Sequence, residues 1–272
     1  MRKSYVSLTV LALVIVGAAT AVAQGVPTTQ PKFLHIFREQ LKPGRGGDHA
    51  KWEAGWPAAF EKAKSPYNYI ALTSVSGPAE VWYVQPLASQ AAYDEMIGFG
   101  DDNPTLAAEL GRLARGAHDF LRGSDQIQAV AMPDLSYGTF PDIGKMRYWE
   151  ITTFHVKPGY DDSWVAATKA YIAATARSAP GASWRTYAVV AGAPGDTYLI
   201  FSSYASFADL DKAMAESQAI WKGVTEEEGT TLTTFMREGV ASVVTNRYRL
   251  DPGQSYVNAE TRASDPEFWE PK

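Results

Sequence analysis

Two stretches of this chain, one in each half, follow the same pattern. The segment that begins at Phe33 reaches Lys42-Pro43-Gly44, and the segment that begins at Tyr148 reaches Lys157-Pro158-Gly159, so the two lie 115 residues apart. Further segments match in the same order at nearly the same spacing: 77–82 with 193–198, 88–89 with 205–206, and 120–122 with 235–237. A constant spacing restricts the chain to folds that one unit, used twice, can build.

Each half predicts the same order of elements. A strand comes first, at 33–41 and at 148–156, because both segments are rich in β-branched and aromatic residues and end at a turn signal. A helix is expected next, at 48–63 in the first half, where Pro57 kinks or restarts it, and from 162 in the second half. Two strands joined by a tight turn follow, at 67–75 and 80–85 in the first half and at 183–191 and 196–203 in the second. Each half then continues with a helix begun by Ser89 or Ser206, a further helix at 104–122 or 225–237, and a last strand at 126–132 or 240–249. The order β-α-β-β-α-β is that of a ferredoxin-like unit.

The first strand is apolar on both faces. Phe33, Phe37 and Leu41 fall on one side, and Leu34 and Ile36 fall on the other. Helices cover one face of such a unit, so the other apolar face needs a partner. We therefore expect an α+β fold in which two ferredoxin-like repeats pack their sheets face to face, with helices outside, as an intrachain pseudo-dimeric α+β barrel. A monomer is expected, because the second copy already supplies the partner.

The ends of the chain suggest export. Arg2 and Lys3 precede an apolar stretch too short to span a bilayer, and Ala21-Val22-Ala23 offers a cleavage pattern. The predicted organisation is a signal peptide at 1–23, a first repeat at 24–137, a linker at 138–147, a second repeat at 148–256 and a flexible tail at 257–272, in a periplasmic or secreted protein. The chain has no cysteine, which excludes disulfides and thiolate metal sites.

The charge balance argues against some partners. With the signal peptide removed, 23 basic residues face 30 acidic ones, and the two signs are well mixed. Neither nucleic acid nor an anionic membrane is expected as a main partner of such a chain.

The segment Tyr148–Gly159 resembles the opening strand of NIPSNAP-like and antibiotic-biosynthesis-monooxygenase-like domains, members of the dimeric α+β barrel superfamily. These domains begin with a Tyr-Glu-hydrophobic strand that runs into Lys-Pro-Gly and an amphipathic helix. The first half departs from this pattern, with His35 in the place of Glu150 and Glu39 in the place of Phe154. The superfamily includes cofactor-free oxygenases, haem-binding enzymes and isomerases, so the resemblance implies a fold more than an activity.

Two histidines are weak candidates for catalysis. His35 is a titratable group on an otherwise apolar strand face, where it must be paired or line a cavity. His118 flanks the apolar stripe of the helix at 104–122, and the resemblance implies that a helical histidine in this position could ligate haem iron. His49, at a helix start among glycines and charges, is expected on the surface. No metal-ligand spacing is recognised, and no metal or other cofactor is expected.

Aromatic side chains give the remaining candidates. Trp52, Trp56, Tyr69 and Trp82, together with Tyr67, are expected to meet between the helices and the sheet, where the resemblance implies a ligand cavity; an ordinary packed core is the competing interpretation. The leading hypothesis is binding of a small apolar or aromatic molecule, or of a partner protein, without catalysis. The alternatives are a cofactor-independent monooxygenase or isomerase that uses His35 or His118, and a haem-binding protein.

Overall fold

The computed structural model describes residues 25–270, and the predicted signal peptide lies outside this range. Its strands are β1 (Phe33–Leu41), β2 (Tyr69–Ser74), β3 (Glu80–Leu87), β4 (Leu121–Ala131), β5 (Tyr148–Val156), β6 (Arg185–Ala191), β7 (Thr197–Tyr204) and β8 (Val240–Tyr256). Its helices are α1 (Gly46–Glu53), α2 (Gly55–Ala63), α3 (Ala91–Asp101), α4 (Pro104–Ala117), α5 (Asp161–Ser178), α6 (Phe207–Lys222), α7 (Glu226–Glu238), α8 (Ala259–Ser264) and α9 (Pro266–Trp269), with 3-10 turns at Pro133–Leu135 and Ile143–Lys145.

The eight strands close into one antiparallel barrel. Around the ring the order is β1-β3-β2-β8-β5-β7-β6-β4, and β4 returns to β1. The strands of the first half therefore run β4-β1-β3-β2, and those of the second half run β8-β5-β7-β6. The halves join through hydrogen-bonded seams between β2 and β8 and between β4 and β6. The sheets are thus continuous at their edges, which goes beyond the expected face-to-face packing.

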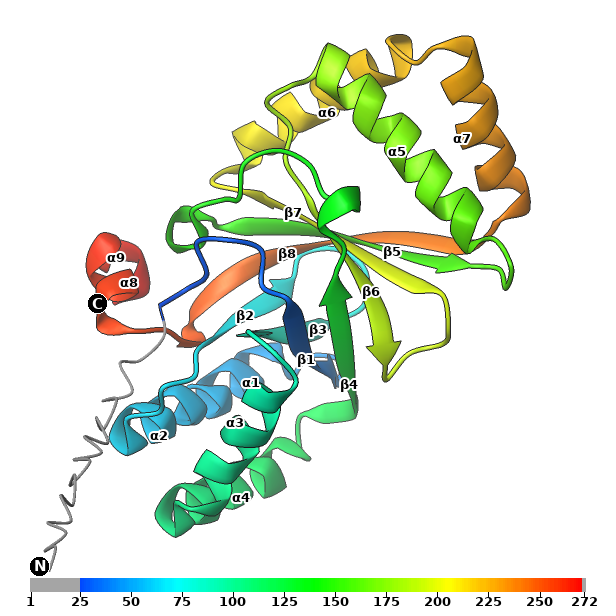
Figure 1. The fold of residues 1–272 in the computed structure, drawn as a ribbon. Coiled ribbons are helices and arrows are strands. Elements are labelled where there is room, and N and C mark those ends of the chain that lie inside the picture. Colours follow the sequence, from blue (N-terminus) through cyan, green and yellow to red (C-terminus); the bar gives the residue numbers. More distant parts are fainter. Residues whose placement is uncertain (1–24, 271–272) are drawn as a thin grey trace, which may run out of the picture.

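Helices cover the barrel on two opposite sides (Figure 1). Helices α1 to α4 lie against the strands of the first half, and α5 to α7 lie against those of the second half. The break between α1 and α2 falls at Ala54, three residues before Pro57, so the interruption expected from the proline is present. In the described range, no helix combines the length and the apolar character that a bilayer span requires.

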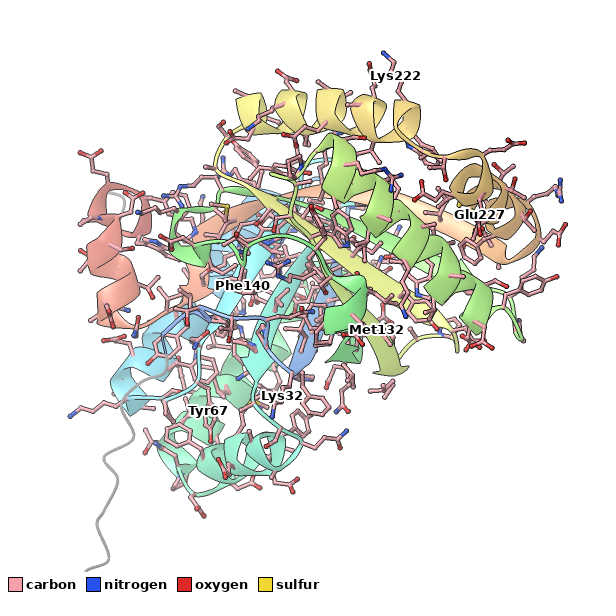
Figure 2. The ribbon with its side chains drawn as sticks, turned by 45° about the horizontal axis from the view of Figure 1, so that its top comes forward. Lys32, Tyr67, Met132, Phe140, Lys222 and Glu227 are labelled. Carbon is pink, nitrogen blue, oxygen red and sulfur yellow. The ribbon has the colours of Figure 1, made fainter. Side chains whose placement is uncertain are left out.

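The barrel interior holds the main hydrophobic core. Because side chains alternate along a strand, Leu34 and Ile36 of β1 point inward while His35 and Phe37 point to the helices. Inward side chains from both halves, including Trp82, Trp149 and Tyr248, share this core. Phe140, which lies between the halves in Figure 2, helps line a small space of about 80 Å³ at this core. The interior is therefore a packed core with little room for a ligand.

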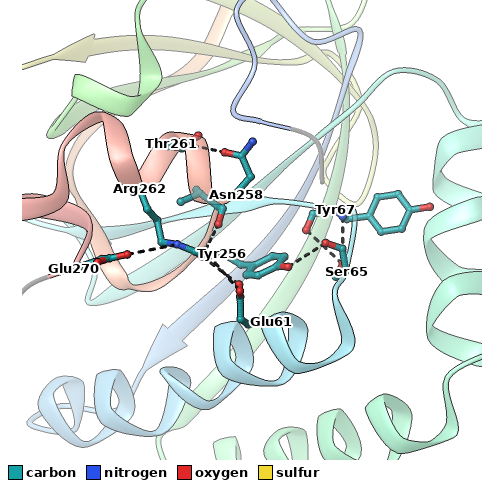
Figure 3. Close-up of polar contacts among 9 residues, drawn as sticks. Glu61, Ser65, Tyr67, Tyr256, Asn258, Thr261, Arg262 and Glu270 are labelled. Atoms are coloured by element: carbon teal, nitrogen blue, oxygen red, sulfur yellow. Dashed lines mark hydrogen bonds and ion pairs between the residues drawn. The ribbon is translucent and has the colours of Figure 1, made fainter. Parts of the chain in front are cut away.

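Between residues 258 and 270, where a flexible tail was expected, the chain forms the short helices α8 and α9. Arg262 of α8 pairs with Glu61 of α2 and with Glu270, and Tyr256 donates a hydrogen bond to the Ser65 carbonyl (Figure 3). Trp269 of α9 is 5% exposed and packs against the barrel core, where its indole donates to the Gly144 carbonyl. A flexible tail was expected because most of its residues are polar, and that composition gave no sign that Trp269 would be buried.

Candidate functional site

A cavity of about 380 Å³ lies between the sheet and the helices of the first half. This volume falls in the range of roughly 300–1,000 Å³ that is usual for small-molecule sites. Its walls are mostly apolar and aromatic. They come from the sheet, from the loop before β2 and from helices α2, α3 and α4: Phe37, Trp56, Phe60, Tyr67, Tyr69, Met96, Ile97, Phe99, Leu106 and Leu110. We call this space the first-half cavity.

Polar side chains reach the first-half cavity at two places along β1. His35 lies at one of them and Glu39 at the other, with Phe37 between them on the same face. At about 3.3 Å per residue, these two positions are roughly 13 Å apart. The cavity therefore has a histidine end and a glutamate end, separated by the ring of Phe37.

Three of the five predicted aromatic residues, Trp56, Tyr67 and Tyr69, line this cavity. Trp82 does not, because its position in the alternation of β3 turns it into the barrel core, where its indole donates to Glu80; Tyr83 takes the cavity-facing place. Trp52 packs beside α4 and donates its indole N–H to the Leu113 carbonyl, 2.9 Å away. The predicted cavity exists, but Trp52 and Trp82 are not among its lining residues.

The histidine end is formed by His35, Gln85 and Gln126. The imidazole Nε2 lies 3.3 Å from Oε1 of Gln126, and the ring meets Tyr93 edge-on with centroids 5.0 Å apart. Burial lowers the pKa of His35 below its usual value, and the weaker contributions of Gln126 and Gln85 oppose this shift. Burial therefore favours the neutral imidazole of His35.

The glutamate end holds three buried polar residues. His49 Nε2 lies 2.7 Å from Oε2 of Glu39, and a carboxylate oxygen of Glu53 completes a group of donor atoms that all lie within 4.8 Å of one another. His49 is fully buried, while Glu39 and Glu53 are each 3% exposed. The Tyr83 hydroxyl lies 3.3 Å from Glu53 Oε2 and 3.1 Å from Gln254 Oε1. We call Glu39, His49 and Glu53 the Glu–His–Glu cluster.

The electrostatics at this end follow from burial. Desolvation, with a smaller contribution from the Glu39 charge, raises the pKa of Glu53 to about 8. Desolvation also raises the pKa of Tyr69 and Tyr83 well above the usual range, and the Glu53 charge adds to it.

The expectation of a surface position for His49 was wrong. Helix α1 presses this ring against β1 and brings it to 6.4 Å, centroid to centroid, from Phe120. His49 and Glu53 are four residues apart on α1 and so share one helix face. The cluster could have been suspected from the sequence, because His49 and Glu53 are four residues apart on a predicted helix. That helix directly follows the strand that carries Glu39.

The structure gives His118 no place in a site. It is exposed, follows the last turn of α4, and lines none of the described cavities. A haem ligand needs to face a space that the porphyrin can enter, and these three cavities offer His118 no such space.

A second cavity, of about 590 Å³, lies under α5, α6 and α7. Glu150 enters it from the same position on β5 that His35 has on β1, and its carboxylate pairs with Arg247 at 3.0 Å. No histidine lines this space. Its lining residues include the exposed side chains of Met214, Trp221 and Met236.

Comparison with solved structures places the fold among α+β barrels. An anthrone oxidase-like protein superposes with a TM-score of 0.53 and 15% identity, covering 85% of this chain and 96% of that one. A candidate monooxygenase from Lactobacillus acidophilus gives a TM-score of 0.52 and 10% identity, covering 84% and 97%. A candidate monooxygenase from Fusobacterium nucleatum gives 0.53 and 10%, covering 83% and 94%. The likeness is one of fold. The chain has an α+β fold with a closed eight-stranded barrel contained in a single polypeptide, and these proteins share that fold.

Sequence comparison adds no relative. No protein-family model matches the chain, and no curated protein matches it.

Proposed function

We propose that this protein binds a small aromatic molecule in the first-half cavity and oxidises it with molecular oxygen. The observation that carries the proposal is the cavity itself, which has aromatic walls and one neutral, cavity-facing imidazole, His35. The barrel fold shared with candidate monooxygenases and an anthrone oxidase-like protein supports the reaction class. Binding alone, without turnover, is the alternative that the same cavity would serve.

The chemistry follows from the placement of His35. A tricyclic ketone such as anthrone can lie between the aromatic walls with its methylene carbon near the imidazole. His35 accepts a proton from that carbon, and the resulting carbanion gives electrons to O₂. The methylene carbon loses both hydrogens and gains one oxygen atom as a ketone, and the second oxygen atom leaves as water. The products are an anthraquinone and water, so atoms and electrons balance.

The test uses anthrone as the probe. We expect the purified protein to consume O₂ and form anthraquinone in a one-to-one ratio, faster than the reaction without protein. His35→Gln should lower kcat by about 100-fold or more, because general-base catalysis typically contributes 10²–10⁴. Glu150→Gln, at the same strand position in the second half, is the matched control and should leave the rate unchanged.

The outcomes separate the two hypotheses. Quenching of tryptophan fluorescence by anthrone without O₂ uptake would establish a binder and refute the oxidase. Equal rates for His35→Gln and Glu150→Gln would remove His35 from the chemistry. No quenching at all would refute both for this class of ligand.

We also propose that the mature protein is exported, and that its halves arose from one ferredoxin-like unit by duplication. Residues 1–23 support export by their charge and cleavage pattern. The matching strand orders of the two halves and the 115-residue spacing support duplication. A mass measurement on the protein recovered from the expressing cells should give a chain that begins after Ala23, and retention of the leader would contradict cleavage.

A further inference from the structure

The Glu–His–Glu cluster places two carboxyl groups and one imidazole together without a lysine or arginine. The donor atoms of its three residues lie within 4.8 Å of one another, and all three residues are buried. The ion pairs found for Glu39 and Glu53 across residues 25–270 include no lysine or arginine. Burying carboxylates costs free energy unless hydrogen bonds and opposite charge compensate them.

Two polar atoms of this cluster lack hydrogen-bond partners within the described chain. They are Nδ1 of His49 and Oε1 of Glu53. A buried donor or acceptor that makes no hydrogen bond costs about 1–3 kcal/mol, so native proteins usually satisfy such atoms with a protein partner, a water or an ion. A ligand atom of Glu53 lies within 4.8 Å of those of Glu39 and His49, so the cluster has polar atoms free to bind a further partner such as an ion.

Glu80 shows how this fold compensates a buried carboxylate that serves structure alone. It is fully buried, and its oxygens contact the Arg38 guanidinium at 2.6 Å, the Tyr248 hydroxyl at 2.6 Å and the Trp82 indole at 3.0 Å. Glu53 has no lysine or arginine partner in the described range, and its side-chain contacts are the Tyr83 hydroxyl at 3.3 Å and the Trp56 side chain. The contrast indicates that the cluster is incomplete in a way that Glu80 is not.

The second half shows that the fold does not need polar residues here. At the positions of Glu39, His49 and Glu53 in their elements, β5 and α5 carry Phe154, Trp164 and Thr168. The rings of Phe154 and Trp164 pack with centroids 4.8 Å apart. An aromatic pair thus serves the packing role that the cluster fills at greater electrostatic cost.

We propose that Glu39, His49 and Glu53 bind one divalent transition-metal ion of the Zn²⁺ class. One imidazole and two carboxylates form a donor set that suits Zn²⁺, Mn²⁺ or Fe²⁺, whereas the imidazole disfavours Ca²⁺ and Mg²⁺. Donor atoms around one tetrahedral Zn²⁺ lie roughly 3.4 Å apart. His49 Nε2 and Glu39 Oε2, now 2.7 Å apart, would therefore move slightly apart, and donor pairs near the 4.8 Å limit would move closer together. Three protein ligands leave one coordination position, and the carboxylates that border the first-half cavity would open that position to it.

The test measures metal binding by the mature chain after it has been stripped with a chelator. Zn²⁺ is titrated in competition with a chromogenic chelator, and Co²⁺ is added separately to record its visible absorption. We expect one ion per chain and a Co²⁺ spectrum of nitrogen and oxygen ligation. Glu53→Gln and His49→Gln should each weaken Zn²⁺ binding by about 100-fold or more, since loss of outer-shell partners alone costs 10–100-fold.

Asp48→Asn is the matched control, because Asp48 is an exposed carboxylate on the same helix and lies next to His49. It should bind Zn²⁺ like the parent protein. Circular dichroism confirms folding of each variant, and Glu39→Gln is a third cluster variant in case one does not fold. Absence of a stoichiometric ion, preference for Ca²⁺ over Zn²⁺, or equal affinity of Asp48→Asn and Glu53→Gln would each overturn the site.

The metal site goes beyond the proposed oxidation and is measured without any aromatic compound. Failure to bind metal therefore leaves the His35 proposal as it stands, and failure to oxidise anthrone leaves the metal site as it stands.

Discussion

Single residues on β1 determine what kind of site the first half can hold. His35 and Glu39 interrupt an otherwise apolar cavity face, and Leu34 and Ile36 on the opposite face keep the barrel interior dry. In the second half, Glu150 occupies the position of His35 and Phe154 that of Glu39. The first-half cavity thus offers a neutral imidazole and the proposed metal ligands, and the second-half cavity offers neither. Differences at a few positions of one strand account for this.

His35 should make stability depend on pH. Its pKa in the folded protein lies below the value of the unfolded chain, mainly because of burial. Between these two pKa values the unfolded chain binds more protons, so the free energy of unfolding falls as the pH drops through the unfolded value of about 6.5, and the loss is complete below the folded value.

Urea unfolding between pH 7.5 and 5 tests this dependence. The midpoint should fall less with decreasing pH in His35→Gln than in the parent protein, because glutamine does not titrate. Parallel midpoint curves for the two proteins would contradict the assignment.

At the scale of helices, α4 positions the wall of the site through a close contact with α1. A Cβ added at Gly116 would lie 1.9 Å from the Trp52 ring, which is fixed by its hydrogen bond to Leu113 and by Arg112 over its face. The absence of a side chain at Gly116 is therefore what lets α1, with His49 and Glu53, approach this closely.

Gly116→Ala should destabilise the protein by about 1–3 kcal/mol, as overpacking in a core does. Gly111→Ala is the matched control on the same helix, where the nearest contact is the flexible end of Arg115 at 3.5 Å. It should stabilise by about 0.5–1 kcal/mol through helix propensity. Equilibrium urea unfolding measures both changes, and a shift of the same sign in the two variants would refute the packing argument.

Local signals predicted the elements well, and long-range packing explains what they missed. The segments 33–41 and 148–156 are strands with the expected bounds, because alternation and the Lys-Pro-Gly turn are local properties. Trp82 was expected in the cavity, but alternation along β3 turns Trp82 into the barrel core and places Tyr83 in the cavity wall. Burial of His49 depends on contacts with β1 and Phe120, which no local pattern encodes.

For the whole molecule, closure of the barrel removes every free sheet edge in the described range. The seams β2–β8 and β4–β6 use hydrogen-bonding groups that would otherwise be open to a second chain. We therefore expect a monomer, measured as the mass of a single chain by light scattering. A concentration-independent dimer would show that another surface, such as the exposed side chains near Trp221, associates.

The same closure should make the two halves unfold together, and α9 offers a way to test it. Trp269 follows both halves in the chain, yet its indole lies in the core that they share and binds the Gly144 carbonyl. Trp269→Ala should cost about 3–5 kcal/mol, as truncation of a buried aromatic residue does, and should lower one cooperative transition seen alike by fluorescence and far-UV circular dichroism. Trp221→Ala, at a site 52% exposed, is the control and should cost far less. Two separate transitions in the Trp269 variant would mean that each half can stay folded while the other is unfolded. That result would contradict a single core shared by both halves, because unfolding one half would also remove the core of the other.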